Sequence, residues 1–220
     1  MNESGAQFWD AWWEKKFSLF TPHGAFMSLH DSSVLSVALR LDGSRQRHIL
    51  LPGNGWSLVP YALAACGFEV VVIDISKLVL ERVATKASEG EILRYLTAPA
   101  RSLTKSHSHS GGSVTLVHGD VFSYLFDRQF DLIYEDRLAM LLNERGQAKL
   151  AEQYHSWLQP GGLCAIRTIN YGLRQTNEGW DGSAVEPLRA QLGAAFLAAG
   201  FCEGRQKPLD KVVEFLHSSG

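Results

Sequence analysis

The residues best suited to chemistry in this chain follow two apolar runs in its first third. The first run, Ile49–Leu51, leads into Gly53-Asn54-Gly55, and the second run, Val70–Ile73, ends on Asp74. Glycines let the backbone pass close to a ligand, and a carboxylate can accept hydrogen bonds from both hydroxyls of a ribose. This spacing therefore predicts a site for an adenosine-containing cofactor.

The elements that would position these residues can be read from the hydrophobic pattern. The apolar runs are expected to be strands, joined by a helix from about Leu58 to Cys66 that stops at Gly67. Ser76 is expected to cap a further helix, Lys77–Ser88. A strand, a glycine turn, a helix and a second strand form the unit that binds cofactors in doubly wound folds.

The rest of the chain continues the alternation of strands and helices. The expected strands are Val114–Val117, Phe130–Tyr134 and Leu163–Ile169. The expected helices are Gln7–Lys16, about Ser32–Leu41, Gln147–Leu158 with a stop at the turn Pro160-Gly161-Gly162, and about Glu186–Ala199. This alternation predicts an α/β, doubly wound fold with a mostly parallel sheet.

Two further stretches complete the predicted organisation. The segments Phe201–Arg205 and Lys211–His217 are separated by too little chain for a crossover helix, so the last strand is expected to run antiparallel. Thr97–Ser113 is polar, contains proline and glycine and has no periodicity, which predicts a mobile surface loop.

Composition limits the class of protein. A chain of 220 residues, 45% of them hydrophobic, can bury one sizeable core, which predicts a single domain over residues 1–220. The formal net charge of −2 argues against a general nucleic-acid binder. The three cysteines lack metal or disulfide spacing, and no run resembles a membrane span or a secretory signal. A cytoplasmic protein is expected.

The residues after the glycines distinguish between adenosine cofactors. A dinucleotide site would have a third glycine, but Leu58 occupies that position. Further along the chain, Gly119-Asp120-Val121-Phe122 ends the third predicted strand, where a carboxylate and apolar groups can hold an adenine ring. These features favour S-adenosyl-L-methionine (SAM) over a dinucleotide.

A fourth strand that ends in acids, Phe130–Asp136, precedes a helix, the Pro-Gly-Gly turn and a fifth strand. This succession resembles the class I methyltransferases from about Arg47 to Ile169. The resemblance implies a Rossmann-like, seven-stranded sheet, with SAM as methyl donor and S-adenosyl-L-homocysteine (SAH) as product. No metal is expected, because His107 and His109 lie in a Ser/Gly-rich stretch without further ligands.

Aromatic residues near the amino terminus indicate one family among the class I methyltransferases. Trp9, Trp13 and Phe20, followed by Thr21-Pro22-His23, are similar to the opening of the thiopurine S-methyltransferase family, and FDLIYEDRLAMLLN resembles its strand-four segment. In that family a tryptophan-bearing helix and the following aromatic residue close over the cofactor. The resemblance therefore implies an N-terminal helical lid region over residues 1–45 and a SAM-binding α/β core over residues 46–220.

Two segments differ from the family pattern. Relatives have an acid-Arg-Gly sequence after strand four, whereas this chain has Glu135-Asp136-Arg137-Leu138, and Asn177–Gly182 replaces proline-rich segments near the substrate pocket. The resemblance implies a small thiol or other soft nucleophile as methyl acceptor. The alternative is an O- or N-methyltransferase of a small metabolite. A nicotinamide-dependent oxidoreductase and a catalytically silent SAM-binding protein are less favoured.

The predicted site residues fall into two groups. The candidates for catalysis are the charged residues after strand four and a histidine near the lid: Asp136, Glu135, Arg137 and His23. The candidates for cofactor contact belong to the lid, the glycine turn and the strand ends: Trp9, Trp13, Phe20, Pro52, Gly53, Asn54, Gly55, Asp74, Ile75, Asp120, Val121, Phe122 and Glu135. The expected partner is a small-molecule acceptor, with no nucleic acid and no membrane, and the expected assembly is a monomer or a homodimer.

Overall fold

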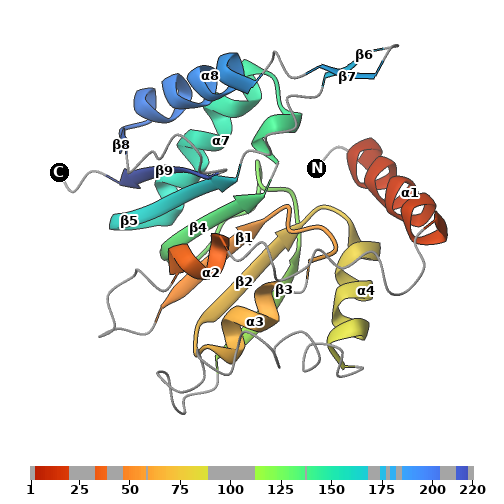
Figure 1. Cartoon of the computed structure of the whole chain (residues 1–220). Helices are drawn as coiled ribbons and strands as arrows, with labels where there is room; N and C mark the ends of the chain where they lie inside the picture. Colours follow the sequence, from red (N-terminus) through yellow and green to blue (C-terminus); the bar gives the residue numbers. More distant parts are fainter. Residues whose placement is uncertain are drawn as a thin grey trace. The chain divides into compact units, whose positions relative to one another are not determined.

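The computed structural model describes residues 3–19, 33–38, 47–57, 59–88, 112–136, 138–167, 174–176, 179–181, 185–203 and 212–217. The chain divides into two compact units, Met1–Leu125 and Phe126–Gly220. The single domain predicted over residues 1–220, with its lid and core regions, stays a prediction. Figure 1 shows the elements in chain order.

The first unit is built on three parallel strands in the order β3-β2-β1. The strands are β1 (His48–Pro52), β2 (Glu69–Asp74) and β3 (Ser113–His118). Helix α3 (Val59–Ala65) connects β1 to β2, and α4 (Lys77–Ser88) follows β2. The strands, glycine turn and helices predicted around Asp74 are therefore confirmed, with element ends shifted by a few residues.

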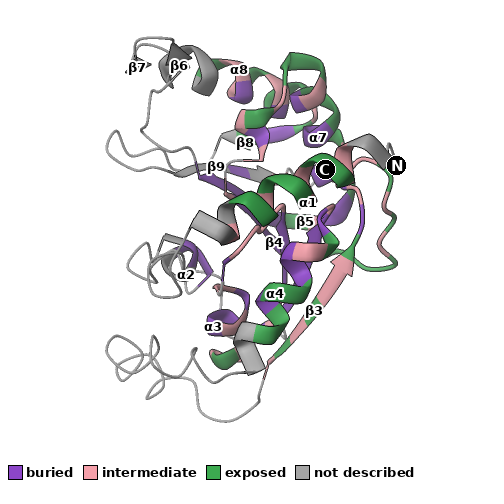
Figure 2. Cartoon of the chain, turned by 90° about the vertical axis from the view of Figure 1, so that its right-hand side faces the viewer, coloured by how far each residue is buried: buried purple, intermediate pink, exposed green. Residues whose placement is uncertain are grey.

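Burial explains why the strands of this unit differ in sequence. All but the first residue of β1 and of β2 are buried, which requires the continuous apolar runs seen in the sequence. Strand β3 has only exposed and half-buried residues, drawn green and pink in Figure 2, because it forms the edge of the strand order. The predicted loop at 97–113 lies almost entirely outside the described residues.

Two helices precede β1. Helix α1 (Glu3–Leu19) is longer at both ends than the predicted Gln7–Lys16, and it packs against α4. Helix α2 (Ser33–Ala38) corresponds to the helix expected at about Ser32–Leu41. Within the described ranges, no helix combines the length and the apolar character that crossing a membrane requires.

The second unit is built on strands in the order β4-β5-β9-β8. Strands β4 (Phe130–Asp136) and β5 (Leu158–Arg167) are parallel, whereas β9 (Val212–His217) runs antiparallel to β5 and to β8 (Phe201–Glu203). The prediction of an antiparallel last strand is confirmed. The helical elements are η1 (Ala139–Leu141), α7 (Glu144–Trp157) and α8 (Val185–Ala198).

The predicted turn at Pro160-Gly161-Gly162 is wrong. Strand β5 begins at Leu158, directly after α7, and pairs with Phe130 before residues 159–162 form an irregularity opposite Asp131. Such a bulge adds residues to one strand of a pair without ending the strand. A Cβ atom on Gly162 would lie 2.8 Å from the carbonyl oxygen of Gln159, so this bulge needs a glycine there.

Two other local features of this unit were not predicted. Helix α7 begins before Gln147, because the side chain of Asn143 accepts a hydrogen bond from the backbone N–H of Gly146 and caps a polar first turn. Strands β6 (Arg174–Thr176) and β7 (Gly179–Asp181) form a short antiparallel hairpin.

Candidate functional site

The glycine turn after β1 depends on backbone conformations that other residues rarely adopt. Gly53 and Gly55 have φ angles of 59° and 55°, in the left-handed region that favours glycine. The backbone N–H of Gly53 donates to the carbonyl of Ile73 (2.8 Å), which joins the turn to β2. The side-chain amide of Asn54 donates to the carbonyl of Ser57 (3.1 Å), so Asn54 stabilises the turn by a hydrogen bond inside it.

Asp74, the last residue of β2, is the carboxylate at the centre of this unit's site. Its Oδ2 accepts from the backbone N–H of Gly55 (3.0 Å), and its Oδ1 accepts from the backbone N–H of Ser76 (2.9 Å). The residue is 6% exposed. Burial raises the pKa of this carboxyl, and the two backbone hydrogen bonds act against that rise. Because each carboxylate oxygen has more than one acceptor direction, Asp74 can also receive ligand hydroxyls.

The residues after β2 and β3 are held beside Asp74. The backbone N–H of Gly119 donates to the carbonyl of Asp74 (3.0 Å), and His118 Nε2 lies 3.1 Å from the carbonyl of Ile75. Asp120 Oδ1 accepts from the backbone N–H of Phe122 (2.9 Å), which fixes the turn that also carries buried Val121. Pro52, at the end of β1, is buried in register with Ile73.

Helix α1 lies on the glycine turn. A Cβ atom built on Gly55 would lie 2.9 Å from Cζ2 of Trp13, and one built on Gly5 would lie 3.7 Å from Cδ1 of Ile75. The ring of Phe17 meets the ring of Trp56 edge to face, with centroids 4.3 Å apart. Trp9 contacts Phe8 and Trp12 within α1, whereas the predicted Phe20 and His23 lie outside the described residues.

Substituting Gly55 with alanine is expected to loosen α1. The positive φ costs an L residue about 1–2 kcal/mol, and the added methyl group must also displace the Trp13 indole. Gly161→Ala is the matched control, because Gly161 has φ 78° with no atom within 4 Å of the added carbon. In urea unfolding, the backbone strain should lower the free energy of unfolding by a similar amount in both variants. Faster hydrogen exchange in α1 should appear in Gly55→Ala alone.

The two acids at the end of β4 have different surroundings. Glu135 is 0% exposed, and its Oε1 accepts from the backbone N–H of Ala139 (3.0 Å), at the start of the turn into η1. Burial, and secondarily the charge of Glu135, raises the pKa of Tyr154 and of Cys164 well above their usual values. Glu135 therefore points into the packed interior of this unit.

Asp136 forms an ion pair with a residue that the sequence patterns did not indicate. Arg167 ends β5 in register with Asp136, and its Nη1 lies 3.0 Å from Asp136 Oδ2. The side chains are 21% exposed for Asp136 and 9% for Arg167. Successive residues of a strand face opposite sides, so Asp136 and Glu135 cannot both serve the same ligand face. Predicted Arg137 lies outside the described residues.

Within the first unit, the structure brings together four of the predicted residues: Gly53, Gly55, Asp74 and Trp13. Within the second unit, predicted Asp136 lies beside Arg167. Ser76 was predicted only as a helix cap and Asp10 not at all, yet both contact the elements that hold Asp74. In the described parts of the chain, no three His, Cys, Asp or Glu side chains gather as a metal site would require.

The fold defined by these elements is that of the class I methyltransferases. The glycopeptide N-methyltransferase MtfA with bound SAM gives a TM-score of 0.59 at 15% identity, over 91% of this chain and 99% of that chain. The magnesium protoporphyrin IX methyltransferase ChlM from Synechocystis PCC 6803, also with SAM, gives 0.57 at 14%, over 85% and 77%. The N-methyltransferase NodS from Bradyrhizobium japonicum WM9 gives 0.55 at 15%, over 86% and 96%.

The sequence itself identifies the family. The family model of thiopurine S-methyltransferase matches residues 4–182, and the chain belongs to this family. A comparison with curated proteins gives no significant match. The resemblance drawn from the amino-terminal aromatics and the strand-four segment is confirmed, as is the α/β fold class with a mostly parallel sheet. The predicted cofactor, SAM, is the one that methyltransferases of this family use.

Proposed function

We propose that this protein transfers a methyl group from SAM to a small-molecule acceptor with a thiol or another soft nucleophile. The observation that supports cofactor binding most is Asp74, a buried carboxylate held by the backbone of Gly55 and Ser76 at the tip of β2. Gly53 and Gly55, both with positive φ, form the turn beside this carboxylate that cofactor-binding strand–helix units have. Both features fit an adenosine ribose, and the carboxylate would accept its hydroxyls.

On the cofactor side, the chain's residues hold the adenosine and exclude water. Bound SAM supplies an electrophilic methyl group on a positively charged sulfur. Asp74 and the glycine turn fix the adenosine end, so that a nucleophile can be held in line at about 3 Å from the methyl carbon. Trp13 and Phe17 of α1, which lie against Gly55 and Trp56, exclude water from the turn. Ile75, Asp120, Val121 and Phe122 are the proposed contacts of the adenine ring.

On the acceptor side, we assign Asp136 an orienting role. Its Oδ2 is held by Arg167, which fixes the carboxylate at the carboxyl end of β4, the edge where doubly wound folds bind ligands. A thiol near its pKa needs little help in losing its proton, so orientation suffices for a soft acceptor. A hydroxyl or amine acceptor would need a base, for which Asp136 and His23 are the candidates.

The second candidate function is an O- or N-methyltransferase of a small metabolite. It is favoured by the changed residues after strand four and by the hairpin β6–β7, which includes part of the stretch where relatives have proline-rich segments. The acceptor is proposed to be a small molecule in either case, with no nucleic acid or membrane as partner and with a monomer or homodimer as the assembly.

Calorimetry and product analysis test the proposal together. SAM and SAH should bind to the purified protein, whereas NAD and NADP should not. Incubation with SAM and a panel of small thiols, phenols and amines should release SAH only with an accepted compound, and thiols are expected to be the best. NAD binding without SAM binding would contradict the assignment. SAH binding without turnover of any acceptor would instead identify a silent binding protein.

A further inference from the structure

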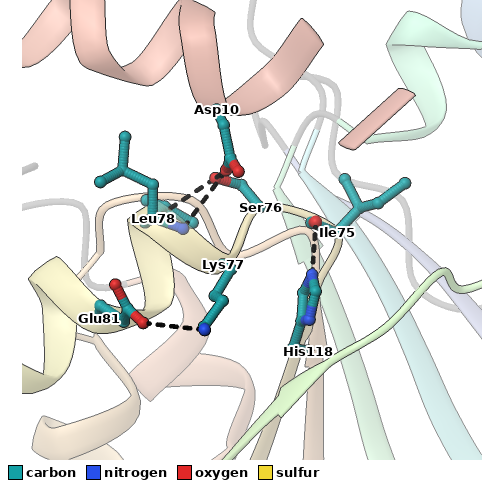
Figure 3. A network of polar contacts seen from close by, with 8 residues as sticks. Asp10, Ile75, Ser76, Lys77, Leu78, Glu81 and His118 are labelled. Atoms are coloured by element: carbon teal, nitrogen blue, oxygen red, sulfur yellow. Dashed lines mark hydrogen bonds and ion pairs between the residues drawn. The ribbon is translucent and has the colours of Figure 1, made fainter. Parts of the chain in front are cut away.

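The carboxylate of Asp10 connects helix α1 to the start of α4, beside the glycine turn. Asp10 Oδ1 lies 2.5 Å from Ser76 Oγ and 3.3 Å from the backbone nitrogen of Leu78, and both groups donate to it (Figure 3). Leu78 lies in the first turn of α4, whose N–H groups have no acceptor inside the helix. A carboxylate is favoured at this position, because the helix dipole places partial positive charge there.

Ser76 connects this attachment to Asp74. Ser76 is fully buried, and its backbone N–H donates to Asp74 Oδ1 while its Oγ accepts from the backbone N–H of Val79 (3.2 Å). The same Oγ donates to Asp10. One serine therefore links the proposed ribose carboxylate, the start of α4 and helix α1.

A second contact of α1 is with Gly55, the residue that binds the other carboxylate oxygen of Asp74. Trp13, about one turn after Asp10, lies against Gly55, whose N–H donates to Asp74 Oδ2. Phe17 continues the contact through Trp56, and the Arg82 guanidinium of α4 lies 5.6 Å from the Phe17 ring centroid. Only 6% of Asp74 is exposed, and α1 contacts both of its backbone partners, Gly55 through Trp13 and Ser76 through Asp10, so a shift of α1 changes the surroundings of both carboxylate oxygens.

We infer that Asp10 is a positioning residue that holds α1 over the nucleoside site and thereby sets how long SAM or SAH stays bound. The inference rests on the proposed function for its ligand and on the contacts of Asp10 for its mechanism. Asp10 need not touch the ligand, because it acts through Ser76, Leu78 and the helix that carries Trp13.

The SAH dissociation rate, followed by tryptophan fluorescence in a stopped-flow experiment, tests the inference. Asp10→Ala removes charge-assisted hydrogen bonds and should speed SAH release by about tenfold to a hundredfold. Asp10→Asn keeps an acceptor oxygen and should have a smaller effect. Glu14→Gln is the matched control, because it removes one carboxylate from an exposed position on the same helix and should leave the rate unchanged.

Hydrogen exchange provides a second readout that needs no ligand. Amides of α1 should exchange faster in ligand-free Asp10→Ala than in the wild type or in Glu14→Gln. A double-mutant cycle with Ser76→Ala should be strongly non-additive, because the two side chains contact each other. Unchanged α1 exchange and unchanged SAH release in Asp10→Ala would overturn the inference.

The failure of this inference can be separated from a failure of the proposed function. If the wild-type protein does not bind SAH, the proposed cofactor is wrong, and so is the residence-time role of Asp10. If the wild type binds SAH and Asp10→Ala releases it at the wild-type rate, the proposed function stands and Asp10 has no positioning role. Asp10→Asn decides the matter if Asp10→Ala does not fold, because it must then show both faster release and faster α1 exchange.

Discussion

Replacing Asp74 with alanine is expected to lower the affinity for SAH on the order of tenfold to a hundredfold. Under the proposed function, the substitution removes hydrogen bonds between the ribose and a charged group, and such bonds contribute about 1.5–3 kcal/mol. It also leaves the backbone N–H groups of Gly55 and Ser76 without the carboxylate that now orders them. Titration calorimetry with SAH measures the effect, and an affinity equal to that of the wild type would remove Asp74 from the site.

Two further substitutions separate binding from folding at this position. Asp74→Glu keeps the charge and changes only its reach, so its loss of affinity should be smaller than that of Asp74→Ala. Asp74→Asn keeps an acceptor but removes the charge, and it should bind SAH weakly at every pH where the wild type binds well. If Asp74 only stabilises the glycine turn, Asp74→Asn should have a lower free energy of unfolding and an unchanged affinity for SAH.

The pH dependence of stability also tests whether Asp74 serves ligand binding or folding, because the pKa of Asp74 is shifted in the folded protein. Burial raises this pKa in the folded protein, so the folded chain holds the proton more tightly than the unfolded chain does. The resulting stability is fully present below the unfolded pKa, at about 3.9, and is lost as pH rises through the higher folded value. The unfolding free energy of the wild type minus that of Asp74→Asn should therefore fall as the pH rises above the unfolded pKa. At neutral pH the charge opposes folding, as expected for a carboxylate kept for a ligand.

The first unit could be predicted closely because its signals are local. The apolar runs of β1 and β2, the glycines between them and Ser76 before α4 each act within a few residues, and each was found where the sequence placed it. The strand ends of a parallel sheet then bring Asp74 to the glycine turn without further information.

The two errors in the second unit have different causes. The glycines at 161 and 162 predict a turn, but β5 pairs with β4 on both sides of them, and they form a bulge inside the strand. In that strand the local sequence is compatible with two structures, and the pairing with β4 selects one. The first turn of α7 was missed for a local reason: its residues are polar and give no hydrophobic period, and the signal that marks its start is the cap Asn143.

Two residues of the candidate site could not be predicted from the local sequence. Nothing near Asp10 or Arg167 in the sequence marks them, because each gains its role from a partner far along the chain: Ser76 for Asp10 and Asp136 for Arg167. The alternation of a strand could have separated Glu135 from Asp136, but only the structure shows that Glu135 is the one turned inward.

The largest effect on turnover is expected at Asp136, and acceptor chemistry separates its two possible roles. If Asp136 is a general base, Asp136→Asn should slow methylation of a hydroxyl or amine acceptor by about 10²–10⁴-fold, and should slow a pre-ionised thiolate much less. If Asp136 orients the acceptor, the loss should be similar for both acceptors and independent of pH. We expect the second result, because Arg167 already holds one oxygen of this carboxylate.

The ion pair itself requires a control, since Asp136→Asn removes the charge that pairs with the mostly buried Arg167. Removing one member of a buried pair destabilises a protein by about 3–5 kcal/mol, and by less when the pair is partly exposed, as here. The double variant Asp136→Asn/Arg167→Met should recover stability in urea unfolding but not the methylation rate. Recovery of both would make the pair purely structural. Glu135→Gln should lower stability through the Ala139 contact, and if it alone lowers the rate, Glu135 acts on the acceptor and Asp136 does not.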